Sequence, residues 1–185
     1  LAMAMMPDDL ETRSMRGDVA EMEHMLDDYL AFARGEGGED STITDLSELV
    51  RDTAAAAAKA RQRDGISVVT PGPVDVSVKR AALRRCLTNL IDNALKQGRR
   101  VVVTLKQGES LVEIEVEDDG PGIAADRREE AFRPFHRLDE GRNLQAGGSG
   151  LGLAIARDIA RAHGGDIVLG DSELGGLKAT IRLPV

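Results

Sequence analysis

The sequence contains few aromatic residues, a single cysteine and no long apolar run, and each scarcity excludes a class of protein. Aromatic residues make up 2% of the chain, so the core must be built from Val, Ile, Leu, Ala and Met. The one cysteine, Cys86, cannot form an internal disulfide or a cysteine-based metal site, and it fits a reducing compartment. No apolar run approaches the length of a membrane span, and no signal peptide is visible.

Positive charge is also scarce, since 24 Lys and Arg stand against 32 Asp and Glu and give a formal net charge of −8 at pH 7. This balance argues against a nucleic-acid partner, because phosphate contacts along a nucleic acid need clustered Lys and Arg. A nucleotide site needs only a local positive patch, so ATP is not excluded. The length of 185 residues leaves room for one sizeable domain and a small appendage.

The first segment, residues 1–38, is rich in Met, Asp and Glu and is typical of a helical hairpin. Pro7 ends a first helix, and a second helix carries apolar residues at heptad spacing. These are Met15, Val19, Met22, Leu26, Tyr29 and Ala33. The spacing predicts packing against other helices. The alternative is a helix lying on its own domain, but the glycine-rich segment 35–38 favours a linker. Because the chain begins inside the first helix, we expect an upstream part before Leu1.

Residues 39–185 alternate between helical and strand patterns and predict one α+β domain. Helices are expected from a capping box at Asp45 to about Arg63, from Lys79 to about Lys96, and from about 150 to 163. Strands are expected at 66–69, 74–78, 100–106, around 112–116 and at 177–183. Around 112–116 apolar residues alternate with glutamates, which is typical of a sheet with one dry and one wet face. The predicted fold is a mixed sheet covered by helices on one face, behind a helical hairpin.

Two asparagines, Asn89 and Asn93, stand four residues apart on the amphipathic helix and share one helix face. Asparagine is a mediocre helix former, and two that face one way need partners. Amide oxygens suit Mg²⁺, which usually takes its remaining ligands from water and phosphate. The alternative for the pair alone is two capping or surface asparagines.

An acidic, glycine-containing turn follows the strand around 112–116, at Asp118, Asp119, Gly120 and Gly122. The two glycines allow a tight turn and a close backbone approach to a ligand. A carboxylate at the strand end can accept a hydrogen bond from an exocyclic amine such as adenine N6. Taken alone, the same residues could form a solvated Asp-Gly turn.

Glycines at 147, 148, 150 and 152 lead into the last helix. Glycines before a helix start expose amide N–H groups, and the helix dipole adds positive potential for phosphate. The spacing matches neither a P-loop nor a strand-led dinucleotide motif. A flexible linker is the alternative. Just upstream, Phe132 and Phe135 supply half of the aromatics in the chain, which predicts a dedicated role beyond a small satellite core.

The order of these motifs, Asn-x-x-x-Asn, Asp-x-Gly-x-Gly, Phe-x-Pro-Phe and Gly-x-Gly-x-Gly, closely resembles the N, G1, F and G2 boxes of the histidine kinase ATP-binding domain. The same superfamily includes gyrase B and the mismatch-repair protein MutL. The resemblance covers about residues 41–185, and segment 1–38 resembles the end of the dimerisation and histidine-phosphotransfer hairpin of these kinases. Residues 116–124 and 151–155 are most similar to osmosensor-type kinases of Gram-negative bacteria.

The resemblance implies that this chain binds ATP or ADP with Mg²⁺. By motif position, Asn93 would bind the Mg²⁺ that bridges the triphosphate, with Asn89 beside it. Lys96 and Arg137 would contact the phosphates. Residues 136–148 would form a lid over the nucleotide, and the catalytic set would be Asn89, Asn93 and Lys96.

The base side of the implied site begins at Asp118, which would read the adenine amine, while Gly120 and Gly122 make room for the base. Further nucleotide contacts are implied at Ile123, Gly148, Ser149, Gly150, Leu151 and Gly152.

The family's phosphoacceptor histidine box has no match in this chain. His24 lies on the second hairpin helix, His136 lies in the F-box region, and His163 precedes two glycines at a helix end. The resemblance therefore implies a histidine upstream of Leu1, transfer of the γ-phosphoryl to it, and onward transfer to an aspartate of a response-regulator receiver domain. It also implies a homodimer formed through the hairpin, and a cytoplasmic portion of an inner-membrane sensor that meets the membrane only through the upstream part.

Three alternatives stay open. The first is an ATP hydrolase of the gyrase and MutL type, which would use a glutamate where this chain has Asn89. The second is a Ser/Thr anti-sigma-factor kinase, which lacks a heptad hairpin. The third is a dimerising scaffold with an inactive ATP pocket, against which the intact boxes argue.

Overall fold

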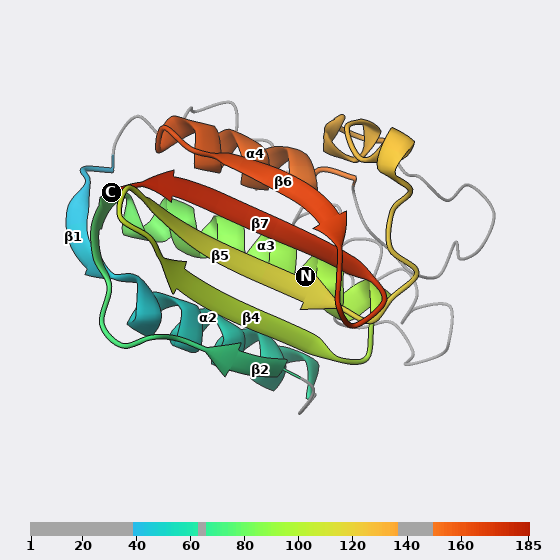
Figure 1. The fold of residues 1–185 in the computed structure, drawn as a ribbon, viewed down its shortest axis with the longest axis horizontal. Helices are drawn as coiled ribbons and strands as arrows, with labels where there is room; N and C mark the ends of the chain where they lie inside the picture. Colours follow the sequence, from blue (N-terminus) through green and yellow to red (C-terminus); the bar gives the residue numbers. More distant parts are fainter. Residues whose placement is uncertain (1–38, 63–65, 137–149) are drawn as a thin grey trace, which may run out of the picture.

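The computed structural model describes residues 39–62, 66–136 and 150–185. The predicted helical hairpin and its heptad positions lie outside these ranges, as does the proposed boundary at residue 38. The described part contains the five-stranded sheet, the three helices and a small second sheet (Figure 1). It therefore covers the region in which the four motifs were found.

The main sheet is mixed, with the strand order β2-β4-β5-β7-β6. Only β2 and β4 are parallel neighbours, and the other three pairs are antiparallel. The strands are β2 (Ile66–Val69), β4 (Val101–Gln107), β5 (Leu111–Asp118), β6 (Asp166–Asp171) and β7 (Leu177–Pro184). A separate two-stranded sheet pairs β1 (Thr42–Asp45) with β3 (Asp75–Val78).

Three helices cover one face of this sheet (Figure 1). They are α2 (Leu46–Arg61), α3 (Arg80–Gln97) and α4 (Gly152–Ala162). Two short 3-10 turns, η2 (Ala125–Arg127) and η3 (Glu130–Phe132), follow β5. The predicted α+β class, with helices on one face of a mixed sheet, is confirmed.

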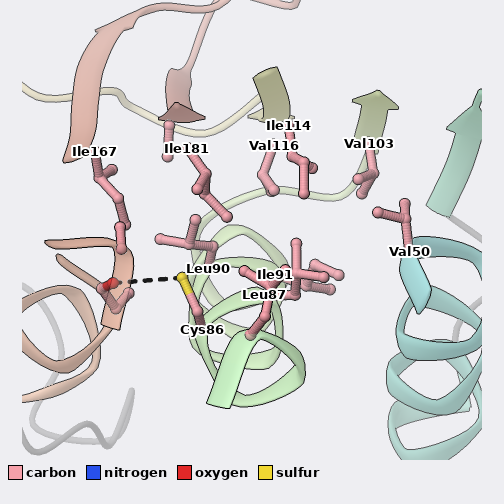
Figure 2. Close-up of a cluster of buried hydrophobic side chains, with 14 of the residues drawn as sticks. Val50, Cys86, Leu87, Leu90, Ile91, Val103, Ile114, Val116, Ile167 and Ile181 are labelled. Atoms are coloured by element: carbon pink, nitrogen blue, oxygen red, sulfur yellow. Dashed lines mark hydrogen bonds between the residues drawn. The ribbon is translucent and has the colours of Figure 1, made fainter. Parts of the chain in front are cut away.

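The core lies between α3 and the sheet, where the helix period and the strand period present apolar side chains to each other. Figure 2 shows Ile114 and Val116 on β5 pointing toward Leu87 and Leu90 on α3. All four side chains are at most 2% exposed. Burial of this kind stabilises the α3–β5 part of the core without aromatic residues.

The opposite face of β5 is more buried than the alternation of apolar residues and glutamates predicted. Glu113 and Glu117 are partly exposed there, but Glu115 is only 8% exposed. Its carboxylate accepts a hydrogen bond of 2.8 Å from the Lys106 ammonium on β4. A paired charge can lie within a sheet face because its partner replaces the water that it loses.

Strands β1 and β6 were not expected from the sequence. Strand β6 is an edge strand that buries only Ile167 and Leu169, so its pattern is too short to stand out. Strand β1 ends at Asp45, whose carboxylate caps α2 by accepting from Ser47 N at 2.9 Å and also accepts from Val74 N at 3.0 Å. The predicted cap residue of this helix is therefore confirmed.

Arg157 on α4 joins the edge strand β6 to the turn at Phe132. Its guanidinium donates to Asp166 from Nε at 2.8 Å and to Glu129 at 2.8 Å, and it lies 4.2 Å from the centre of the Phe132 ring. Hydrogen bonds from Arg157 are the main cause that lowers the pKa of Asp166 to about 2. Charge-assisted bonds and a cation–π contact hold the F-box turn against α4.

Candidate functional site

Helix α3 carries two amide side chains on the edge of its buried face. Asn89 and Asn93 are both half-buried, one turn apart. The amide nitrogen Nδ2 of Asn89 is buried and has no hydrogen-bond partner among the residues that the structure describes. A buried donor without a partner is costly in a finished core and ordinary in a binding site.

The carboxylate that ends β5 belongs to Asp118, whose side chain is 2% exposed. One of its oxygens, Oδ1, accepts from Gly120 N at 2.8 Å and from Leu177 N at 3.2 Å. Burial raises the pKa of the Asp118 carboxyl, and the hydrogen bonds from Gly120 and Leu177 oppose that rise. Two backbone donors thus fix one oxygen in place and orient the whole carboxylate.

Gly176 shapes this acidic turn and was missed from the sequence. A Cβ added to it would overlap Asp118 Oδ1, the Asp118 carbonyl and the backbone nitrogen of Gly120. Its own N–H donates to the Asp118 carbonyl at 3.1 Å. Gly122, which has φ +68°, also lies close to the Gly176 carbonyl, so a predicted site glycine and an unpredicted one pack together. Only residues without a Cβ allow this approach.

The C-terminal end of α3 contacts the acidic turn directly. A Cβ on Gly120 would lie 2.8 Å from the Gln97 carbonyl, and one on Gly98 would lie 3.1 Å from the Asp118 Cβ. Asn93 and Lys96 occupy the last turns of the same helix. The helix that carries the residues predicted for the metal and the phosphates therefore ends against the turn that carries the residue predicted for the base.

The glycine that begins α4 lies against the middle of α3. A Cβ on Gly152 would lie 3.9 Å from the side chain of Asn89. Gly150 has φ +69°, and its carbonyl accepts from Phe135 N at 3.2 Å. No side chain within the described ranges caps the N-terminus of α4. The dipole of a helix favours negative charge at this end.

The remaining predicted residues differ in burial. Lys96 is exposed, and Ile123 is half-buried against the core. Leu151 is 6% exposed, so its side chain belongs to the core. Arg137, Gly148 and Ser149 lie outside the described residues.

The described residues thus form an α/β sandwich in which one helix contacts both the acidic turn and the start of α4. Residues 78–185 match the family described as Histidine kinase-, DNA gyrase B-, and HSP90-like ATPase. The match covers more than half of the chain, and the chain belongs to this family.

Sensor kinases are among the relatives that the chain resembles. It is 33% identical over 181 residues to the sensor histidine kinase CpxA of Escherichia coli, covering 95% of this chain and 40% of CpxA. It is 46% identical over 106 residues to the sensor histidine kinase GtrS of Pseudomonas aeruginosa, covering 57% of this chain and 22% of GtrS. The chain thus spans less than half the length of these relatives.

A solved structure extends the likeness to the backbone. The histidine kinase domain of the E. coli osmosensor EnvZ superposes with a TM-score of 0.60 at 34% identity, over 79% of this chain and 89% of that one. This likeness agrees with the osmosensor-type resemblance seen in the motifs, and it confirms the fold.

Proposed function

We propose that this chain is the catalytic, ATP-binding region of a two-component sensor histidine kinase. The observation that carries the proposal is the position of α3, which contacts the Asp118 turn at its end and Gly152, at the start of α4, at its middle. Asn89 lies at the second of these contacts, and Asn93 lies between the two. A nucleotide laid along this helix would place its base at one turn and its phosphates at the other.

In the proposed site Asp118 accepts a hydrogen bond from the adenine amine through Oδ2, because its Oδ1 already takes two backbone N–H groups. Gly120 and Gly122 would act on the base indirectly, because their missing side chains let the acidic turn pack against the backbones of Gln97 and Gly176. Backbone amides at Gly150 and Gly152 face the phosphates, and Lys96 adds positive charge. The further contacts proposed from motif position are Ile123, Arg137, Gly148, Ser149 and Leu151.

The side chains present fit a magnesium ion held mainly by the nucleotide. The described residues contain no group of three or more His, Cys, Asp or Glu side chains that could hold a metal. Mg²⁺ in ATP sites keeps water and phosphate oxygens as most of its ligands and needs few protein ligands. Asn93 would supply one amide oxygen, and the ion would neutralise charge on the triphosphate.

The chemistry of α3 favours phosphoryl transfer over hydrolysis. Its one carboxylate is Asp92, which pairs with Arg61 of α2 at 3.1 Å. The position one turn before Asn93 holds Asn89, whose amide cannot take a proton from water. Without a base on this helix, the site positions ATP and neutralises its charge while another group attacks the γ-phosphorus.

In the whole protein, the attacking group would be a histidine upstream of Leu1, and a response-regulator aspartate would receive the phosphoryl group next. Segment 1–38 would complete a dimerisation hairpin. No helix in the described ranges is long and apolar enough to cross a membrane. We place this region on the cytoplasmic side of a membrane sensor, as for a sensor kinase whose ATP supply is cytoplasmic.

The test uses a longer protein that restores the residues upstream of Leu1. Incubation with γ-labelled ATP and Mg²⁺ should give a protein-bound label that is lost in acid and kept in base, because phosphohistidine is acid-labile. Adding a receiver domain should then remove the label from the kinase. A label that survives acid, or release of free phosphate without any labelled protein, would contradict the proposal.

Asp118→Asn should reverse the base preference of the site. The asparagine keeps one oxygen for Gly120 and Leu177 but places an amide donor where Oδ2 was. That donor opposes the adenine amine and suits the 6-oxo group of hypoxanthine. We expect ATP affinity to fall about 30-fold and inosine triphosphate to become the better ligand. Calorimetric titration of both nucleotides measures this, with the exposed Asp126→Asn as control.

The same variant should be more stable without nucleotide. Because burial raises the pKa of Asp118, the stability given by the neutral acid is present below the ordinary value of 3.8 and is lost as the pH rises through the folded-state pKa. At pH 7 the carboxylate is therefore an unfavourable buried charge, and asparagine removes it. A lower melting temperature for Asp118→Asn at pH 7 would contradict the assigned burial.

A further inference from the structure

Asp119, the neighbour of the base-reading carboxylate, holds the turn that joins α3 to β4. Its Oδ1 accepts from Arg99 N at 2.6 Å and from Arg100 N at 2.9 Å. These two N–H groups follow directly after the end of α3 at Gly98. We call this arrangement the Asp119 clasp: one carboxylate oxygen and the backbone N–H groups of Arg99 and Arg100.

The clasp explains a glycine that backbone conformation does not require. Gly98 has φ −117°, which any residue adopts, so its lack of a side chain must have a steric cause. A Cβ there would lie 2.7 Å from Asp119 Oδ1 and 3.1 Å from the Asp119 nitrogen. The turn after α3 is therefore pressed against the acidic turn, with the carboxylate between them.

The hydrogen bonds of the clasp favour an ionised carboxylate. Donation from Arg100 N and Arg99 N lowers the pKa of Asp119, so the acceptor stays charged at neutral pH. Asp118 and Asp119 thus have different surroundings, one buried at the strand end and one tied to the helix end. Asp118 can therefore face a ligand, while Asp119 fixes the position of Asp118.

We propose that Asp119 is a positioning residue, which sets the distance between the base-reading Asp118 and the asparagines of α3 by clasping the end of that helix. The inference rests on the proposed function, because it assigns a task within the same ATP site. Its consequence is a specific one: losing the clasp should impair recognition of the base more than recognition of the phosphates. Asp118 would still be present but less well aligned with the adenine amine.

The experiment compares ATP with inosine triphosphate, whose base lacks the amine that Asp118 reads. For Asp119→Ala we expect ATP affinity to fall about 10-fold and inosine triphosphate affinity to fall about twofold, since a misaligned bond to a charged acceptor changes affinity by roughly that factor. The ratio of the two affinities is the readout. A general loss of stability lowers both affinities together and leaves this ratio unchanged.

Two further variants separate geometry from charge. Asp119→Asn keeps an oxygen acceptor for Arg99 and Arg100, so it should retain the wild-type ratio, whereas a role of the negative charge would make it behave like Asp119→Ala. Gly98→Ala leaves Asp119 in place but inserts a Cβ against its carboxylate, and it should lower the ratio in the same direction. The matched control is Asp126→Ala, because Asp126 is an exposed aspartate in the segment between β5 and α4.

The outcomes distinguish this inference from the proposed function. If the wild-type chain binds ATP no better than inosine triphosphate, the proposed reading of adenine by Asp118 is wrong. If the wild-type chain prefers ATP and Asp119→Ala keeps the same ratio, the positioning role alone is wrong. Equal ratios in Asp119→Ala and Asp119→Asn, both below the wild-type ratio, would overturn the geometric role in favour of charge.

Discussion

Asn93→Ala is expected to lower the Mg²⁺-dependent affinity of the chain for ATP by about 100-fold or more. In the proposed site Asn93 gives the ion a side-chain ligand through its amide oxygen. Loss of a ligand to a charged group costs roughly 3 kcal/mol, and each 1.4 kcal/mol is about a factor of ten in affinity. Calorimetric titration with ATP in Mg²⁺ and in EDTA measures the difference.

The EDTA titration makes this prediction specific. Without the divalent ion, wild type and Asn93→Ala should bind ATP equally weakly, because only the metal-bridged contact is lost. Thr88→Ala is the control on the same helix, since the Thr88 hydroxyl donates to the Arg84 carbonyl of its own helix at 2.9 Å. Unchanged affinity of Asn93→Ala in Mg²⁺ would remove Asn93 from the site. An equal loss in EDTA would show a role in folding or in direct nucleotide contact.

The elements with strong periodicity could be predicted from the sequence almost to the residue. Helix α3 was expected from Lys79 to about Lys96 and runs from Arg80 to Gln97, because Leu83, Leu87 and Leu90 repeat at helical spacing. Strands β4, β5 and β7 were equally clear from their alternation. In these elements local propensity and burial favour the same structure, so tertiary packing does not override what the local sequence predicts.

The edges and contacts of the fold could not be predicted in this way. Strand β6 buries too few side chains to show a pattern, and its Asp166 is held by an arginine from α4. The clasp of Asp119 joins residues 20 and 19 positions apart, which no local motif records. Asp-Gly turns are common, and only the approach of a helix end and a neighbouring strand makes this one a candidate site.

Gly176 is the clearest example of a contact that could not be predicted from the sequence. In the sequence it is the second of two glycines before a strand, which is typical of an ordinary turn. Its proximity to Asp118 arises because β5 and β7 pair antiparallel with Glu117 opposite Lys178. That register brings the start of β7 against the end of β5, and a register between distant strands is a property of the whole sheet.

Gly176→Ala is expected to destabilise the domain by about 3 kcal/mol and to abolish measurable ATP binding. The added Cβ would lie 2.5 Å from both the Asp118 carbonyl and the Gly120 nitrogen. Backbone atoms cannot rotate away as a side chain can, so the acidic turn must move and break the hydrogen bonds that orient Asp118. Urea denaturation measures the free energy of unfolding, and calorimetry measures binding under conditions where the variant is still folded.

Gly170→Ala is the matched control, because it makes the same chemical change in a neighbouring strand. A Cβ on Gly170 would lie 3.9 Å from Lys178 Cε, an ordinary contact with a flexible side chain. Its free energy of unfolding should stay within about 0.5 kcal/mol of wild type, since removing a glycine from the unfolded chain offsets small losses. If Gly176→Ala instead folds with wild-type stability and binds ATP normally, the acidic turn tolerates displacement. The close approach of β7 then does not determine the position of Asp118 in the site.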